Sequence, residues 1–415
     1  MYSFETFRST YHEEIRQFPL HMIGGFNGNE IIGWGAVKMT GEQCKQAGIK
    51  HALLVTTGLK GTGIIEEVQS ICKHAGVETT IFKVGQTNPR EEDVYNGVKA
   101  FQASGADGFL SVGGGSSHDT TKMIRMLLGN PGMKLAEKAI LLDPHFYQIL
   151  PSIKPCAYAQ IAVNTTTGTG AEMTGFAVVT DWEAHWKYVM IAANMLPTMG
   201  ILDPALLRTL PERVAAQSGI DCFVHGMGGF VSRVGNHLSK ACGMYAAKLC
   251  YENLPEFTYN RLNDKACEGM AWAQYLGAMT YATGGGVGMI HGLAHQISAV
   301  NNLHHGLTNA MTMVPVVKRN YKATPAAFAE VGRTAFGMDT FKMDRFEAAE
   351  KTVERIEYFR NLVGIDDKAC KLSTYNLTEA DCRHMAKNTI NDLCNEASAR
   401  DWTEEDSFDV YMEMM

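Results

Sequence analysis

Four of the chain's fourteen histidines lie within one apolar stretch of sixteen residues. His291 and His295 are four residues apart, which on a helix places both side chains on one face. Asp221 and His225 repeat this spacing, and His305 follows beside a glycine where we expect the helix to break. Imidazoles with a carboxylate favour a divalent transition metal such as Fe²⁺ or Zn²⁺. A four-coordinate site with an open position needs fewer imidazoles, so at least one has another role.

Two glycine-rich loops follow strand-like segments: "SVGGGSSHD" (111–119) and "NTTTGTGAE" (164–172). Because glycine lacks a Cβ, backbone N–H groups there can approach phosphate oxygens, and a helix N-terminus favours negative charge. Two such loops at the carboxyl ends of strands in one sheet predict a dinucleotide site. A tight strand-to-helix turn in the first loop, and local turn hydrogen bonds from the threonines of the second, remain alternatives.

The elements that must position these residues change in character near residue 204. Before it, strand-like segments alternate with helix-like ones, which predicts a parallel sheet with crossover helices; they are 51–58, 63–76, 78–84, 91–105 and 108–117, followed by a strand, loop and return in 158–181. After it, segments 212–234, 238–254 and 265–285 have helical apolar spacing. We expect a Rossmann-like α/β domain over 1–204 and an all-α metal-binding domain over 205–415.

Composition excludes several classes of partner. A net charge of −7 and a pI near 6.1 offer no basic field for nucleic acid or anionic lipid. No apolar run reaches the roughly 20 residues that span a bilayer, and the polar N-terminus lacks a secretory signal pattern. The ten cysteines are scattered, which favours reduced thiols. We expect a cytoplasmic protein that acts on small molecules and forms a dimer or larger homo-oligomer.

The order of four motifs resembles the iron-activated (group III) alcohol dehydrogenases over nearly the whole chain. These are "GGGSSHD", "TTTGTGAE", "GIDCFVH" and "HGLAHQISAVNNLHHGLTNA"; within that family, "TTGLKGTGIIEE" and "HHGLTNA" look most like the methanol:acceptor oxidoreductase branch. The resemblance implies the architecture shared with dehydroquinate synthase-like enzymes. It also implies NAD(P) on the first domain, one divalent metal on the second, and hydride transfer in the cleft between them.

The resemblance also implies individual roles. The metal ligands fall at Asp221, His225, His291 and His305, while His295 lies by the nicotinamide and assists proton movement. Together the loops and the resemblance predict that the cofactor is bound by Thr57, Gly113, Gly114, Gly115, Ser116, Asp119, Thr165, Thr166 and Thr169. Many relatives carry Asp at the position of Thr57, where its charge repels a 2′-phosphate. We therefore expect NAD(H) to be the preferred cofactor, with NADP(H) also possible.

Seven further residues depart from the family pattern or have open roles. His304 either supports a metal ligand by a hydrogen bond or has a purely structural role, and we favour the structural role. We interpret His118 as a solvated residue at a helix start, and Lys122 as either a phosphate partner or a surface cation. Asn164 could reach the substrate, and the residues from Met227 to Gly229 would widen the wall beside the metal.

These observations and the resemblance predict an alcohol dehydrogenase or aldehyde reductase that acts on a short primary alcohol or aldehyde, with or without a polar substituent. A divalent metal with three neutral imidazoles and one carboxylate keeps a net positive charge and can act as a Lewis acid. A metal- and NAD-dependent lyase or cyclase of the dehydroquinate synthase type is the alternative, although few Lys or Arg residues surround the metal motif. A non-catalytic metal- or nucleotide-binding protein is a third. Iron against zinc, and an exchangeable against a tightly bound nucleotide, stay open.

Overall fold

The computed structural model describes residues 21–24, 29–85, 88–135 and 153–415. The chain forms two compact units, one of residues Met1–Thr166 and Gly170–Pro211, the other of Thr167–Thr169 and Glu212–Met415. The boundary that the sequence predicts after residue 204 falls at the start of helix α7, which belongs to the first unit. The N-terminal segment without a signal pattern lies outside the described residues.

A seven-stranded sheet forms the centre of the first unit, in the order β1-β2-β9-β6-β5-β3-β4. Neighbouring strands are parallel except β1 and β2. The strands are β1 (His21–Gly24), β2 (Asn29–Ile32), β3 (His51–Thr56), β4 (Glu78–Lys83), β5 (Gly108–Gly113), β6 (Gln160–Asn164) and β9 (Met199–Leu202). Strand β4 lies on one side of β3 and the chain then crosses to β5 on the other side. This reversal is a topological switch point, where ligands bind at the carboxyl ends of strands.

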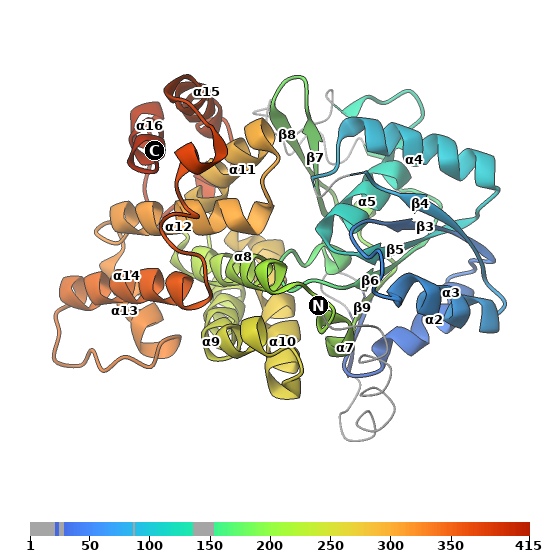
Figure 1. Cartoon of the computed structure of the whole chain (residues 1–415), viewed down its shortest axis with the longest axis horizontal. Helices are drawn as coiled ribbons and strands as arrows, with labels where there is room; N and C mark the ends of the chain where they lie inside the picture. The colour runs from blue at the N-terminus through green and yellow to red at the C-terminus, as the bar shows by residue number, and fades with distance from the viewer. Residues whose placement is uncertain (1–20, 25–28, 86–87, 136–152) are drawn as a thin grey trace. The chain divides into compact units, whose positions relative to one another are not determined.

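Crossover helices flank this sheet, as the alternating pattern predicts (Figure 1). Helix α3 shows why: Ile64, Val68 and Cys72 recur every four residues and all are buried. The helices of the unit are α2 (Thr40–Gln46), α3 (Ile64–His74), α4 (Glu91–Ser104), α5 (Gly115–Gly129) and α7 (Pro204–Leu207). Short 3₁₀ turns are η2 (Ala36–Met39), η6 (Ala171–Met173) and η7 (Ala193–Met195). The Rossmann-like α/β prediction is confirmed for this unit.

A separate antiparallel hairpin, β7 (Phe176–Asp181) and β8 (Trp186–Ile191), follows the second glycine loop. The return strand that the sequence predicts is therefore present; it pairs with β8 and makes one further bridge, between Thr180 and Arg90. Helix α5 holds this hairpin, because Asp119 Oδ2 accepts from the Val178 N–H at 3.0 Å and Lys122 Nζ donates to the Phe176 carbonyl at 2.5 Å.

The second unit is built from helices, and its described residues contain no strand. The helices are α8 (Glu212–Val231), α9 (His237–Tyr259), α10 (Asp264–Thr280), α11 (Met289–Asn301), α12 (His305–Asn320), α13 (Pro325–Thr334), α14 (Arg345–Leu362), α15 (Glu379–Thr389) and α16 (Glu404–Glu413). A π-turn, η8 (Tyr281–Gly285), ends α10, and 3₁₀ turns η9 (Leu372–Tyr375) and η10 (Leu393–Ala397) lie between the last helices. The all-α prediction is confirmed. In the described part of the chain, no helix combines the length and apolarity needed to cross a membrane.

Candidate metal centre and nucleotide site

Three helices of the second unit supply the histidine and aspartate side chains. Helix α8 carries Asp221 and His225 one turn apart, and α11 carries His291 and His295 in the same relation. The break falls before His305, as the last residue of α11 is followed by Asn302 in the left-handed region (φ 55°). His305 is thus the first residue of α12.

The imidazoles of three histidines converge on one carboxylate oxygen. Asp221 Oδ1 lies 3.4 Å from His291 Nε2, 3.6 Å from His305 Nε2 and 3.7 Å from His225 Nε2. The rings of His225 and His291 stack with centroids 4.8 Å apart. The side chain of Asp221 is 2% exposed, and that of His305, the most open of the four, is 24% exposed. Four possible ligand atoms therefore face one small volume that is largely closed to solvent.

The charges in this cluster suit a cation. Burial lowers the pKa of His225 to about 4, and burial also lowers the pKa of His291, so both rings are neutral near pH 7 with Nε2 able to offer a lone pair. Although burial alone would raise it, the pKa of Asp221 lies below its ordinary value because His225 and His305 lie close. A buried anion among neutral imidazoles lacks a positive partner, and a divalent metal would supply one.

The ring of His225 is oriented by the segment Thr167–Thr169. His225 Nδ1 lies 3.2 Å from the Gly168 carbonyl, a bond in which Nδ1–H donates and Nε2 stays available for a metal. A Cβ on Gly168 would lie 2.9 Å from Asp221 Oδ2, so the close approach requires glycine. Thr167 Oγ1 bonds to Ser218 Oγ at 2.8 Å and anchors the segment to α8.

Asn309 also belongs to this cluster, and we did not predict it from the sequence. Its Nδ2 donates to Asp221 Oδ1 at 2.7 Å and lies 3.1 Å from His291 Nε2 and 3.2 Å from His305 Nε2. Its place four residues after His305, on the same face of α12, was the available signal. The amide holds the carboxylate where the imidazoles converge.

His295 bonds to a second carboxylate, Asp392. Its Nδ1 lies 2.9 Å from Asp392 Oδ2, a pairing that spacing along the chain could not reveal. Its ring nevertheless stacks on that of His305, with centroids 5.3 Å apart. His304 Nδ1 accepts from the Gly306 N–H at 3.2 Å and caps α12, which agrees with the structural interpretation of His304.

Three of the predicted cofactor segments meet at the carboxyl edge of the sheet in the first unit. Thr57 follows β3, and its N–H donates to Ser117 Oγ at 3.1 Å at the start of α5. Gly113 ends β5 with φ 149°, and its carbonyl accepts from the Thr165 N–H, after β6, at 2.9 Å. A Cβ on Gly114 would lie 2.6 Å from Thr166 Cγ2. These residues surround the switch point between β3 and β5.

The remaining predicted cofactor residues lie beside or beyond this edge. Gly115 and Ser116 begin helix α5, whose first backbone N–H groups suit an anion. Asp119 lies one turn further along, with Oδ1 3.3 Å from Lys122 Nζ and Oδ2 on the hairpin. Thr169 belongs to the second unit, where its carbonyl accepts from Tyr281 at 2.5 Å. Roles for Asp119 and Thr169 in cofactor binding stay predictions.

The interpretation of His118 as a solvated residue is wrong. His118 is fully buried beneath the glycine loop, with Nδ1 2.8 Å from Ser111 Oγ, which also accepts from Gln160 at 2.9 Å. Burial, reinforced by the Lys122 charge, lowers its pKa to about 3. Lys122 is likewise fully buried, so both alternatives for it, a phosphate partner and a surface cation, are wrong: its ammonium ties α5 to the hairpin.

Two departures from the family pattern also have structural roles. Asn164 is 2% exposed and bonds within its own loop, to the carbonyl of Thr166 at 2.6 Å and to its N–H at 3.2 Å, so it does not project toward a substrate. Gly228 and Gly229 do not widen a wall. A Cβ would lie 2.9 Å from the Val287 carbonyl at Gly228 and 2.1 Å from Thr280 Cγ2 at Gly229, so these glycines permit close packing.

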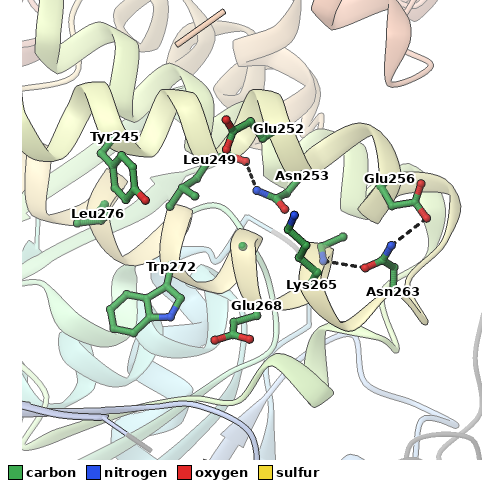
Figure 2. Close-up of a pocket in the computed structure, with 12 residues that line it drawn as sticks. Tyr245, Leu249, Glu252, Asn253, Glu256, Asn263, Lys265, Glu268, Trp272 and Leu276 are labelled. Atoms are coloured by element: carbon green, nitrogen blue, oxygen red, sulfur yellow. Dashed lines mark hydrogen bonds between the residues drawn. The ribbon is translucent and has the colours of Figure 1, made fainter. Parts of the chain in front are cut away.

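A groove of about 700 Å³ lies elsewhere in the second unit, between α9 and α10. Figure 2 shows Tyr245, Trp272 and acidic side chains such as Glu252 and Glu268 along it. None of the predicted metal or cofactor residues lines this groove. Its size therefore does not mark the chemistry, and the side-chain geometry of the histidine cluster does.

Comparison with known proteins gives the same assignment to both units. Residues 28–204 match the family described as "Iron-containing alcohol dehydrogenase", and residues 215–415 match "Fe-containing alcohol dehydrogenase family, C-terminal". The chain is similar to the NAD-dependent methanol dehydrogenase of Bacillus methanolicus, with 33% identity over 91% of this chain and 95% of that protein.

Two further similarities extend this result. A methanol:N,N-dimethyl-4-nitrosoaniline oxidoreductase of a Mycobacterium species is 33% identical over 85% of this chain and 82% of its own. The solved structure of a 1,3-propanediol oxidoreductase superposes with a TM-score of 0.82 at 27% identity, over 96% of this chain and 100% of the other. The likeness thus covers both the sheet unit and the helical unit.

Proposed function

Because this chain belongs to the iron-containing alcohol dehydrogenase family, it is a metal-dependent alcohol oxidoreductase, and we propose that it acts on a short primary alcohol with NAD(H). In the forward direction, R–CH₂OH and NAD⁺ give R–CHO, NADH and H⁺. The observation that carries the proposal is the convergence of three imidazole nitrogens on the Asp221 carboxylate. The lyase alternative has no support from the family or from these relatives.

We assign one divalent metal, Fe²⁺ or Zn²⁺, to Asp221, His225, His291 and His305. Three neutral imidazoles and one carboxylate leave such a metal with one net positive charge, and when bound it supplies Lewis-acid stabilisation of developing negative charge on the substrate oxygen. The Gly168 carbonyl supports the assignment, because it holds Nδ1 of His225 and leaves Nε2 for the metal.

The proton released from the alcohol needs a carrier within the same unit. We propose His295 for this role, since its ring stacks on that of His305 while its Nδ1 bonds to Asp392. Imidazole gains and loses a proton near neutral pH, which suits it to pass a proton toward solvent. His295 is thus the catalytic residue of the proposal.

For the nucleotide we propose the edge of the sheet at the switch point, with NAD(H) preferred. Thr57, Gly113, Gly114 and Thr165 surround that point, and the N-terminus of α5 offers backbone N–H groups to the phosphates. Gly115, Ser116, Asp119, Thr166 and Thr169 complete the proposed set. NADP(H) remains possible, because Thr57 carries no charge that would repel a 2′-phosphate.

The substrate class is tested on purified protein. Native mass spectrometry with metal analysis would report the bound metal, any retained nucleotide and the oligomer; we propose a homo-oligomer in the cytoplasm. The rise of nicotinamide absorbance is then followed with methanol, ethanol and 1,3-propanediol, since relatives are named for methanol and 1,3-propanediol. Turnover of a primary alcohol by the metal-loaded protein is expected. Metal-loaded protein with bound NAD that oxidises none of these alcohols would contradict the proposal.

A further inference from the structure

Asp392 is a buried carboxylate in which both oxygens accept hydrogen bonds. It caps η10, where Oδ1 accepts from the Cys394 N–H at 3.0 Å. Oδ2 accepts from His295 Nδ1 at 2.9 Å and from Gln296 Nε2 at 3.2 Å. The side chain is 1% exposed. The carboxylate therefore cannot rotate without losing a bond from the helix end, from α11, or from both.

The charge state of Asp392 determines which nitrogen of His295 carries a proton. Burial alone would raise the pKa of Asp392, but the His295 ring and the Cys394 N–H hold it below its ordinary value. An ionised carboxylate only accepts hydrogen bonds, so His295 Nδ1 must be the donor. In the neutral ring this leaves Nε2 as the nitrogen with a free lone pair.

The ring that Asp392 fixes lies beside the proposed metal ligands. It stacks on His305 with an interplanar angle of 21° and meets His291 edge-on, with centroids 5.9 Å apart. Two groups of possible ligand atoms thus lie side by side: Asp221, His291 and His305 in one, and His295, Asp392 and Cys394 in the other. Each group contains its own carboxylate.

A second metal site is the competing explanation for the group that contains Asp392. Its possible ligand atoms lie within 4.8 Å of one another. However, both oxygens of the Asp392 carboxylate already accept hydrogen bonds. In addition, burial beside Asp392 raises the pKa of the Cys394 thiol well above its ordinary range. Cys394 therefore remains a protonated thiol, whereas a metal would need the thiolate.

We propose that Asp392 is a positioning residue for catalysis: it locks His295 with Nδ1 protonated and Nε2 free, so that Nε2 takes part in proton transfer. This rests on the proposed function, because it assumes that His295 carries the proton. It adds a residue from the far end of the chain, on η10, to a reaction otherwise placed on α8, α11 and α12. The arrangement is the carboxylate–imidazole pairing that fixes tautomer and ring orientation in other sites.

The test is Asp392→Asn in the full-length, zinc-loaded protein, because asparagine keeps the shape but no longer demands a donor from His295. Single-turnover hydride transfer should slow about 10- to 100-fold, the usual effect of removing such a partner. Metal content and NAD affinity should stay unchanged, because Asp392 bonds to His295 and Gln296 rather than to the proposed ligands. Histidine-selective ¹⁵N NMR should show His295 losing its pure Nδ1–H tautomer. An unchanged rate, or loss of metal, would overturn the proposal.

A double-mutant cycle separates this inference from the proposed function. In a His295→Ala background, Asp392→Asn should cause no further loss of rate, because Asp392 acts only through that ring. If His295→Ala alone is fully active, the proposed role of His295 fails, while the NMR tautomer still reports on Asp392. A further tenfold loss in that background would overturn the positioning role.

A matched control and a wild-type measurement complete the design. Asp203 is another buried capping aspartate, accepting from the Ala205 N–H at 3.0 Å with no histidine among the bonds it makes, and Asp203→Asn should leave the rate unchanged. If Asp392→Asn fails to fold, the wild-type spectrum decides. A His295 ring protonated at Nε2 rather than Nδ1 would refute the proposal.

Discussion

Both units contain buried histidines near carboxylates, but the polar contacts of these two clusters differ. On α5 of the first unit, donors and acceptors alternate: Lys122 donates to Asp119 and to a carbonyl, and His118 pairs with Ser111. In the second unit, the Nε2 atoms of three imidazoles lie 3.4 to 3.7 Å from one oxygen of Asp221. The contacts on α5 pair side chains with partners spread along the helix and the hairpin, whereas around Asp221 several possible metal-ligand atoms converge on one point. This convergence, more than burial, is what marks the candidate metal site.

Removing the central carboxylate should give the largest effect. Asp221→Ala takes away the only charged ligand and leaves neutral imidazoles, so metal affinity should fall far more than the 10- to 100-fold of an outer partner, and turnover should vanish. Metal analysis after gel filtration and an alcohol oxidation assay measure both. His118→Gln, on α5 of the first unit, is the control and should keep its metal. Full metal retention in Asp221→Ala would refute the ligand assignment.

The two histidines of α11 should separate metal binding from proton transfer. His291→Ala should lose metal, because Nε2 faces Asp221, while His295→Ala should keep metal and slow hydride transfer by about 100-fold or more, the scale of lost acid–base catalysis. Metal content and pre-steady-state rates of both variants are compared side by side. Equal loss of metal in the two would mean that their roles have been exchanged.

The sequence could predict that Asp221 and His225 share one helix face, and that His291 and His295 share another, because i, i+4 spacing on a helix fixes a shared face. The proposed ligand set within these pairs came from the family resemblance. The sequence could not reveal Asp392, which meets His295 across 97 positions, or the capping role of His304. Asn309 carried a spacing signal that we did not use. The four-residue strands β2 and β9 carried none, since such short runs have too few residues to show a period.

The interpretation of His118 as a solvated residue failed for a physical reason. A glycine loop at a helix start is typical of an exposed turn, yet His118 in the first turn of α5 is fully buried, and its neutral imidazole pairs with Ser111 of β5. Burial of a polar side chain depends on partners from other strands. The residues next to His118 in the sequence do not identify these partners.

Acid should destabilise the first unit through His118. Its pKa is about 3 in the folded chain and 6.5 when unfolded, so between these values the unfolded chain binds more protons and stability rises with pH. From pH 7.5 down to 5, the folded state should lose about 2 kcal/mol through this group. Urea unfolding at both pH values, for wild type and His118→Gln, measures it. Equal losses in the two proteins would contradict the assignment.

Filling the glycine loop should weaken nucleotide binding without touching the metal. In Gly114→Val, the new Cβ would start 2.6 Å from Thr166 Cγ2, so the two loops must separate, and overpacking of this kind should raise the NAD dissociation constant about tenfold. Isothermal titration with NAD and metal analysis report the two sites independently. Unchanged NAD affinity would move the phosphate site away from this loop.

The smallest effect concerns the choice of nucleotide and depends on Thr57. This residue is half-buried just after β3, and its backbone N–H is held by Ser117, so the side chain is free to be exchanged with little effect on the loop. Thr57→Asp adds a negative charge at the switch point, where it would repel a 2′-phosphate and accept from a ribose hydroxyl. Solvent weakens the repulsion, so NADP(H) affinity should fall about fivefold with NAD(H) affinity unchanged. Titrations of wild type and variant with both nucleotides measure this difference. If wild type already excludes NADP(H) as strongly as the variant, discrimination lies at another residue.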